Sequence, residues 1–491
     1  MNTRRFYIAY LQIFLAGICL SRAFAQEKLS AYPAVIHIHS TISQADYPPR
    51  RIVSLAQDQG VRILVFTDSF IRRWEYGLPL MPNIFKFSAE EGSIARYGIK
   101  RYLNDFKKIK DEFPGMLILE GAEVAPFYWW SGSVFKKNIS LNDWNRHLLV
   151  IGLKKEQDYR HLPVVGNKYF LPRLKDIFPL LISAILIILG IFFIKSALTG
   201  TRKQKRGLGF LICAAGILFL FNNIPFLASR YSPYQGQKQY LPYQNLINYA
   251  AEKGGLTFWA HPLITEETSL GRLAKTVNFS TLKYPEALML TQGYTGFGVG
   301  ANRDLILAGE KWDDALNSYC EGRRVSPAWV IAEADYRTGG RIDSIQNMIF
   351  LSQFNEGSLY EALAAGRLYI RYYSENKCDI LLDDFQVMDS PADPADGSAF
   401  IAGEITIRNK PRLFIRGTLA TAPPEDLRIE VIRNGRIVKE FNLAGQKEFD
   451  LEFQDDSLET TGRMNYYRLN FFAGNTAVLA TNPIFVRLKN G

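Results

Sequence analysis

Cysteine is scarce in this chain of 491 residues, which contains only four. Cys19 and Cys213 fall within long apolar segments, so the rest of the chain can form at most one disulfide, between Cys320 and Cys378. This excludes a scaffold held together by several disulfides. Two unpaired buried thiols are the alternative for Cys320 and Cys378.

A basic surface is also missing, although the net charge is +10. Eight basic residues flank or separate long apolar segments: Arg4, Arg5, Arg22, Lys195, Arg202, Lys203, Lys205 and Arg206. The rest of the chain carries a net charge of about +2, so we expect no nucleic-acid-binding face. The apolar content of 47% and the charged content of 22% exclude a disordered chain, and the length predicts two or three folding units.

Three long apolar segments indicate export and membrane anchoring. Residues 1–25 have a basic start, an apolar stretch and the small residues of a signal-peptide cleavage site, with an uncleaved anchor as the alternative. Residues 177–194 and 208–228 are each long enough to span a bilayer. The basic loop 195–207 between them is expected in the cytoplasm, which places the flanking regions on the extracytoplasmic or periplasmic side. A buried helical hairpin in a soluble core is the alternative.

Histidine is the other scarce residue, with five in the chain. His37 and His39 follow the apolar run Ala34-Val35-Ile36. On a strand, side chains two residues apart point to the same side, so both imidazoles can reach one metal ion. Two exposed histidines on a strand face are the alternative for this pair taken alone.

Other short apolar runs alternate with helical patterns and predict an α/β fold of parallel strands, of which a barrel is one form. Polar residues stand at or just past the ends of these runs: His39, Asp68, Glu123, His261 and Asp335, with His147 at the edge of another. In parallel α/β folds the carboxyl ends of the strands meet at one edge, where active sites form. We therefore expect these side chains to gather in one site.

The last part of the chain has a different pattern. Alternating apolar and polar residues flank Asn434-Gly435, a strong hairpin signal. Residues 399–491 are therefore predicted to form an all-β, sandwich-like domain. The stretch 390–398, rich in proline, aspartate and glycine, is predicted to be a linker.

Six motifs, taken in order, resemble the PHP (polymerase and histidinol phosphatase) family of metal-dependent hydrolases: His37-Ile38-His39-Ser40, Phe66-Thr67-Asp68, Gly121-Ala122-Glu123, His147-Leu148-Leu149, Ala260-His261-Pro262 and Ala334-Asp335-Tyr336-Arg337. Residues 359–367 and Asn482-Pro483-Ile484 resemble its CehA/McbA-like branch. The resemblance implies a distorted (β/α) barrel formed by residues 26–176 and 229–389. The two-helix transmembrane hairpin, residues 177–228, interrupts that barrel.

The resemblance also implies the metal ligands. His37, His39, Glu123 and Asp335 would hold one divalent ion, and Glu123, His147 and His261 a second, the ions being zinc, manganese or iron. The family positions for a third ion are occupied here by Ala45, Ser69 and Arg337, so all of its ligands are missing together. This pattern favours a two-metal enzyme over random decay.

A bridging water between two such ions becomes hydroxide near neutral pH and attacks phosphorus or a carbonyl carbon. The resemblance therefore implies a hydrolase acting on a small molecule, with phosphoester hydrolysis preferred. The alternatives are carboxylester, amide or carbamate hydrolysis, or a non-catalytic binding or sensing module. Arg337 is predicted to bind a substrate oxyanion, and Asp68 either to act in catalysis or to orient a ligand.

Some residues near these motifs are expected to play no part in the site. His161 is predicted to be a surface residue, and Glu120 and Glu333 to be solvated. Residues 128–130, Tyr-Trp-Trp, could line a pocket, but packing or membrane contact is the preferred interpretation.

Overall fold

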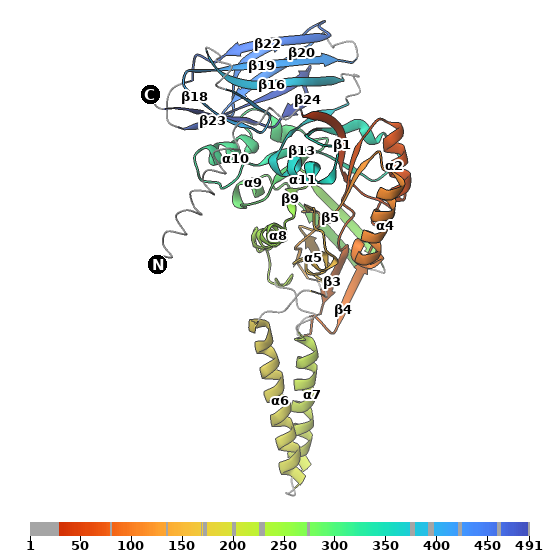
Figure 1. The fold of residues 1–491 in the computed structure, drawn as a ribbon. Coiled ribbons are helices and arrows are strands. Elements are labelled where there is room, and N and C mark those ends of the chain that lie inside the picture. The colour runs from red at the N-terminus through yellow and green to blue at the C-terminus, as the bar shows by residue number, and fades with distance from the viewer. Residues whose placement is uncertain are drawn as a thin grey trace, which may run out of the picture.

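The computed structural model describes residues 29–78, 81–133, 136–167, 169, 174–198, 203–224, 231–272, 275–373, 379–390, 397–420, 425–458 and 463–489. A central barrel lies between a β-rich domain and a projecting helical hairpin (Figure 1). The predicted signal peptide lies outside the described residues, as does Cys378. Cys320 is half-buried and forms no disulfide within the described part of the chain.

Seven strands close a barrel, because the last strand in the order pairs back onto the first. Around the barrel they are β1 (Ser30–Ile38), β2 (Ile63–Phe66), β5 (Leu117–Val124), β8 (Leu148–Ile151), β9 (Leu256–Trp259), β12 (Gly296–Val299) and β13 (Trp329–Tyr336). Neighbours are parallel except at β8, which runs antiparallel to both β5 and β9. The prediction of a barrel-like α/β fold is confirmed. The expectation that every strand is parallel is wrong at β8.

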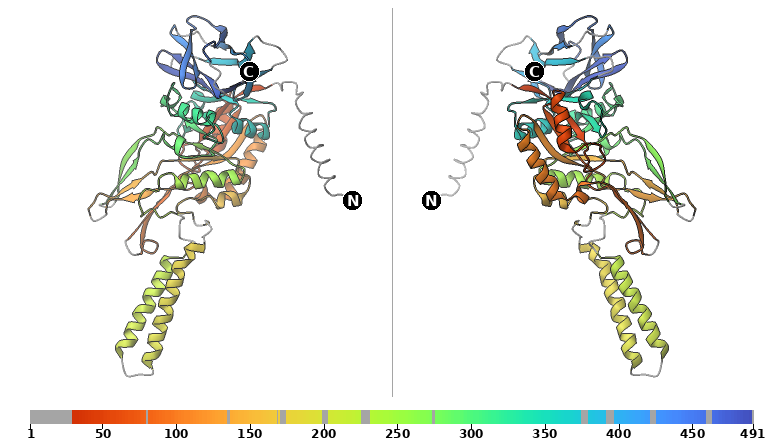
Figure 2. Two further views of the ribbon diagram at one scale, coloured as in Figure 1. Left: turned by 90° about the vertical axis from the view of Figure 1, so that its left-hand side faces the viewer. Right: turned by 90° about the vertical axis from the view of Figure 1, so that its right-hand side faces the viewer.

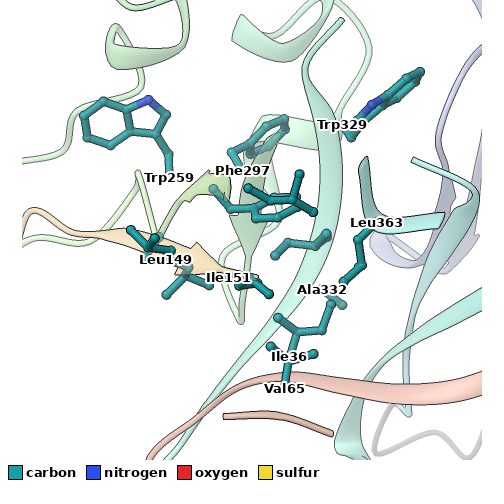
Figure 3. Packing of buried hydrophobic residues seen from close by; sticks show 14 of the residues in the cluster. Ile36, Val65, Leu149, Ile151, Trp259, Phe297, Trp329, Ala332 and Leu363 are labelled. Atoms are coloured by element: carbon teal, nitrogen blue, oxygen red, sulfur yellow. The ribbon is translucent and has the colours of Figure 1, made fainter. Parts of the chain in front are cut away.

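Barrel strands β2, β8 and β9 are buried on both faces, so their sequences are almost entirely apolar. Figure 3 shows side chains of this core packed together, among them Ile36, Val65, Leu149 and Phe297. The main helices of this part of the chain are α2 (Pro49–Asp58), α4 (Ile99–Glu112), α8 (Leu241–Glu252), α10 (Lys311–Cys320) and α11 (Glu356–Ala365). In α4 the buried residues recur every three or four positions, as on one face of an amphipathic helix: Ile99, Tyr102, Phe106 and Ile109.

The sheet continues from the barrel into the C-terminal domain through β14 (Ile345–Leu351) and β15 (Leu368–Tyr372). It goes on with β24 (Thr476–Thr481), β23 (Met464–Ala473), β20 (Leu427–Arg433) and β21 (Arg436–Asn442), and β25 (Ile484–Leu488) pairs with β23 and with β18 (Glu404–Ile407). A second sheet contains β17 (Ser398–Phe400), β16 (Ile380–Ser390), β19 (Lys410–Leu419) and β22 (Glu448–Gln454). Buried apolar residues of both sheets form one cluster, so this part is a β-sandwich.

The hairpin and the first strands of this domain can be compared with the sequence pattern. Asn434 and Gly435 have φ values of 51° and 85° and connect β20 to β21, as the hairpin signal predicted. Strand β16, assigned to the barrel from the sequence, pairs instead with β17 and β19 of the sandwich. Strands β16 and β17, which flank the predicted linker 390–398, therefore belong to one sheet, and residues 391–396 of that linker lie outside the described residues.

Helices α6 (Leu174–Leu198) and α7 (Lys203–Asn222) pack against each other and project away from the rest of the chain (Figure 2). Their backbones approach closely where glycines face the partner helix: a Cβ on Gly190 would lie 2.6 Å from the backbone nitrogen of Cys213. The segments Ile177–Ser196 and Lys205–Asn222 are long and apolar enough to cross a membrane, and only 11% and 17% of their residues are buried. A helix in a soluble core would be mostly buried, unlike these two.

Three small strand pairs extend from the loops after β2, β5 and β9. They are β3 (Arg73–Gly77) with β4 (Lys86–Glu90), β6 (Trp129–Ser131) with β7 (Ser140–Asn142), and β10 (Glu266–Arg272) with β11 (Lys275–Thr281). An aromatic cluster packs among them and contains Trp74, Tyr76, Phe127, Tyr128, Trp130, Trp144, Tyr231 and Phe279. The buried positions of Tyr128 and Trp130 agree with the packing interpretation of that motif.

Candidate metal centre

One end of the barrel collects the metal-binding side chains predicted from the sequence. His37, Glu123 and Asp335 are the second-last residues of β1, β5 and β13. His39 follows β1 and His261 follows β9. His147 precedes β8, but β8 runs in the opposite direction, so its first residue lies at the same end of the barrel. All six predicted ligands therefore converge.

His37, His39 and Asp335 form the first group of potential ligand atoms. The two Nε2 atoms are 3.1 Å apart, and His39 Nε2 lies 3.3 Å from Asp335 Oδ1. Two ligands at about 2.0–2.1 Å from a tetrahedral zinc ion are about 3.4 Å apart. The spacing of these donors therefore fits a metal ion between them.

Glu123, His147 and His261 form the second group. Glu123 Oε1 lies 2.6 Å from His147 Nδ1 and 3.5 Å from His261 Nε2. The same carboxylate also faces the first group, because its Oε1 is 3.4 Å from His37 Nε2 and its Oε2 is 3.6 Å from His39 Nε2. Glu123 thus lies between the two groups and faces both. Imidazole and carboxylate donors together suit zinc, manganese or iron.

Three of these residues have backbone conformations that side chains disfavour. The φ values of His37, His261 and Asp335 are 70°, 34° and 40°. At His37 the pairing of β1 with both β2 and β13 shifts register, as in a β-bulge. Such strained residues concentrate at functional sites, where the surrounding structure holds them in place.

Glu333 was expected to be solvated, and that prediction is wrong. It is buried on β13, with Oε1 2.5 Å from His37 Nδ1, while Oε2 accepts a hydrogen bond of 2.6 Å from the backbone nitrogen of His261. Gly298 of β12 leaves the space it occupies, since a Cβ there would lie 2.0 Å from Glu333 Oε2. Glu333 therefore orients His37 so that Nε2 faces the metal position. The sequence does contain a signal for this role. Glu333 is two residues before Asp335, and on a strand both side chains point to the same side, toward the site.

Asp68 is fully buried and contacts the site through another residue. It accepts hydrogen bonds from the Ser40 backbone nitrogen at 2.7 Å and from Ser43 Oγ at 2.6 Å. Ser43 Oγ lies 3.0 Å from His39 Nδ1. Burial raises the pKa of Asp68, and the nearby His39 and these hydrogen bonds only partly offset that effect. Of the two roles predicted for Asp68, the geometry supports orienting a ligand over direct catalysis.

The site contains carboxylates that stay charged. Burial raises the pKa of Glu123 and Asp335, but the neighbouring histidines outweigh it and hold both well below their usual range. Burial lowers the pKa of His37, yet Glu333 and Asp335 outweigh it and raise it to about 10. Burial lowers the pKa of His147 to about 4 despite the adjacent Glu123. Glu123, Asp335 and His147 are therefore already in the form that binds metal.

Arg337 lies beside the site at the rim of a cavity of about 420 Å³ lined by Gln44, Arg72, Asn145, His147, His261, Ile264, Glu266, Asp335 and Arg337. Its Nε donates to Asp335 Oδ1 and its Nη1 to Gln44 Oε1, both at 2.8 Å. Gln44 donates in turn to Glu91, which accepts from Arg72 Nε at 3.1 Å. Two arginines are thus held in place at the mouth of the site.

Of three other residues considered in the sequence, Ser69 contacts a predicted ligand, whereas Glu120 and His161 lie outside the site. Ser69 donates from Oγ to Glu123 Oε2 at 3.0 Å and so orients that carboxylate. Glu120 forms an ion pair with Lys110 at 2.7 Å, outside the site. His161 is half-buried at the end of α5 (Glu156–Arg160), and it is in neither ligand group.

No family model matches the chain, and no curated protein matches it in sequence. Among solved structures, it is similar to a two-domain protein from Bacteroides vulgatus ATCC 8482 that contains a predicted PHP-like metal-dependent phosphoesterase. The identity is 11% and the TM-score 0.37, over 93% of this chain and 95% of the other. It is also similar to a proposed metal-dependent phosphoesterase from Bifidobacterium adolescentis ATCC 15703, at 11% identity and a TM-score of 0.27, over 67% of this chain and 95% of the other. Both TM-scores lie below 0.5, so neither likeness establishes a family.

Proposed function

We propose that this chain is a membrane-anchored, metal-dependent hydrolase with a two-ion centre, and that its reaction is phosphoester hydrolysis. The position of Glu123 carries the proposal, since its carboxylate lies within 3.6 Å of four histidine nitrogens from two separate ligand groups. The order of the motifs, which resembles that of the PHP family, supports the same function.

The chain's own residues prepare the site for this chemistry. Two divalent ions bound there would polarise a phosphoryl oxygen and lower the pKa of a water molecule. Glu333 and Ser43 fix the orientations of His37 and His39, and Ser69 does the same for Glu123. The ligands therefore need little rearrangement to bind metal.

Two arginines favour a phosphoester over a carboxylester. Arg72 and Arg337 line the same cavity as His147 and His261. A planar guanidinium matches the oxygens of a phosphate and can bind two of them at once. Both side chains are already held by hydrogen bonds to Glu91 or Gln44, so little side-chain entropy is lost when substrate binds.

Helices α6 and α7 form the membrane anchor in this proposal. Figure 2 shows the hairpin projecting from the barrel. Helix α6 begins at Leu174 and α7 ends at Asn222, whereas the basic residues Lys195 and Lys205 lie near the other ends of these two helices. Short loops rich in lysine and arginine tend to remain in the cytoplasm, so we propose that the barrel and the sandwich lie on the extracytoplasmic side.

Hydrolysis by the full-length protein in detergent tests this function. We expect p-nitrophenyl phosphate or bis(p-nitrophenyl) phosphate to be cleaved in the presence of Mn²⁺, Zn²⁺ or Fe²⁺, and chelation to abolish the activity. His37→Ala should be inactive, whereas His161→Ala, a histidine outside the site, should retain activity. Cleavage of p-nitrophenyl acetate alone would favour carboxylester hydrolysis. Metal binding without any hydrolysis would favour a binding module.

A further inference from the structure

The β3–β4 ribbon, residues 73–77 and 86–90, connects the rim of the metal centre with the helical hairpin. At its base, the backbone nitrogen of Glu91 donates to the carbonyl of Arg72 at 2.9 Å, and Arg72 lines the cavity beside the metal ligands. Five residues of extended strand span about 17 Å. The ribbon therefore reaches well beyond the mouth of the site.

The tip of the ribbon is bonded to the end of the second apolar helix. The Asn83 backbone nitrogen donates to Asn222 Oδ1 at 3.1 Å, and Asn83 Nδ2 donates to the Asn222 carbonyl at 2.6 Å. Asn222 is the last residue of α7 and of its membrane-compatible segment. If α7 crosses a bilayer, the ribbon tip lies at the level of the bilayer surface.

Large apolar side chains are exposed at this tip. Leu78 and Phe85 are joined by a backbone hydrogen bond of 2.8 Å, and their exposed fractions are 37% and 53%. Phe87, two residues further along β4, is 55% exposed. Tyr76 is paired with Phe87 across the ribbon, and its ring centroid is 6.1 Å from that of Tyr234, which is 37% exposed. Exposed large apolar side chains together with tyrosines are typical of a surface that contacts the lipid interface.

We propose that the tip of the β3–β4 ribbon inserts into the bilayer interface through Leu78 and Phe85. The ribbon would hold the mouth of the metal centre at a fixed height above the lipid headgroups. Continuity of the tip with the end of α7, through Asn83 and Asn222, favours lipid over a second copy of the chain. This inference rests on the membrane insertion proposed above, and the experiment separates the two.

Fluorescence of full-length protein in lipid vesicles tests the inference. In a background with the four native cysteines replaced by serine, Phe85→Cys is labelled with an environment-sensitive nitrobenzoxadiazole dye. We expect a nitroxide on the lipid near the headgroup to quench most of its emission. Leu78→Cys is a second labelling position, in case the label at 85 disturbs the tip.

Two further positions serve as controls. Ile188→Cys is on an exposed part of α6, near the middle of the apolar segment Ile177–Ser196, and should be quenched by a nitroxide placed deep on the lipid acyl chain if the hairpin crosses the bilayer. Ile437→Cys is exposed on β21 of the sandwich and should remain unquenched. Quenching at 188 but not at 85 or 78 would overturn the ribbon inference alone, whereas no quenching at 188 would overturn membrane insertion as well. A blue shift at 85 that grows with protein concentration, without quenching, would indicate a second copy and also overturn the inference.

Discussion

Glu333 contacts the His37 nitrogen that faces away from the metal position, with its Oε1 2.5 Å from His37 Nδ1. Its Oε2 accepts a hydrogen bond from the backbone nitrogen of His261. One buried carboxylate thus positions a ligand of each predicted ion. A carboxylate bound to the far nitrogen of a ligating histidine fixes its ring and makes it a stronger ligand.

Replacing Glu333 by glutamine should weaken metal binding while the fold persists. Loss of such an orienting carboxylate typically costs about 10–100-fold in metal affinity or activity. Titration of the metal-free protein with Mn²⁺ or Zn²⁺ measures the effect. Glu120→Gln is the matched control, because Glu120 pairs with Lys110 outside the site. Equal affinities in both variants would contradict the orienting role of Glu333.

Replacing Arg337 by alanine should reduce turnover of a phosphoester while the metal content stays at the wild-type level. Arg337 borders the cavity and donates hydrogen bonds to Asp335 and Gln44. It is in neither ligand group, so its loss should not remove a metal ligand. Loss of a single charge-assisted contact in the transition state costs about 10²–10³-fold in kcat. Arg337→Lys keeps the positive charge but lacks the planar guanidinium that can bind two oxygens, so its turnover should lie between those of Arg337→Ala and the wild type. Unchanged kcat/KM in the alanine variant would remove this role.

Metal binding should release a proton from His37 near neutral pH. Burial opposes its charge, but Glu333 and Asp335 outweigh burial and raise the pKa of His37 to about 10. The metal-free histidine is therefore protonated at pH 7, and a ligand must be deprotonated. Apparent metal affinity should rise with pH up to about pH 10. Calorimetry at pH 7 in two buffers of different ionisation enthalpy measures the released proton, and identical heats in both would contradict the prediction.

Arg468 of β23 and Asp313 of α10 join the sandwich to the barrel. Both are buried, and Arg468 Nη2 lies 2.7 Å from Asp313 Oδ2. Arg468→Met leaves a buried carboxylate without its cation and should lower the free energy of unfolding by about 3–5 kcal/mol. Urea denaturation measures this loss, and adding Asp313→Asn should restore part of it. Arg487→Met is the control, because it removes only an exposed ion pair with Glu404. The urea concentration at the midpoint of unfolding should remain unchanged in this variant.

The ligand positions are predictable from sequence because the same pattern marks both the strand and its end. In β1, β5 and β9 a buried apolar run stops at a polar side chain, so the end of the strand and the chemistry appear together. The direction of β8 is not predictable in this way. Its four apolar residues read alike in either direction, and only the pairing with β5 and β9 defines it.

Strand β12 and Glu333 are harder to predict for a shared reason. Two of the four residues of β12 are glycines, so the strand has no apolar run. Gly298 is required because Glu333 occupies the space that a side chain there would need. An acidic residue in a buried strand and a glycine in its neighbour each argue against burial when they are considered separately. Only the three-dimensional pairing of β12 with β13 shows that they compensate each other.

Metal content is the most direct test of the two-ion centre. Elemental analysis of the full-length protein, reconstituted with excess Mn²⁺ or Zn²⁺ and freed of unbound metal, should give two ions per chain. Glu123→Ala should lose both, or keep one weakly, because Glu123 lies between the two ligand groups. A wild-type value of zero or one, or two ions retained in Glu123→Ala, would contradict the account.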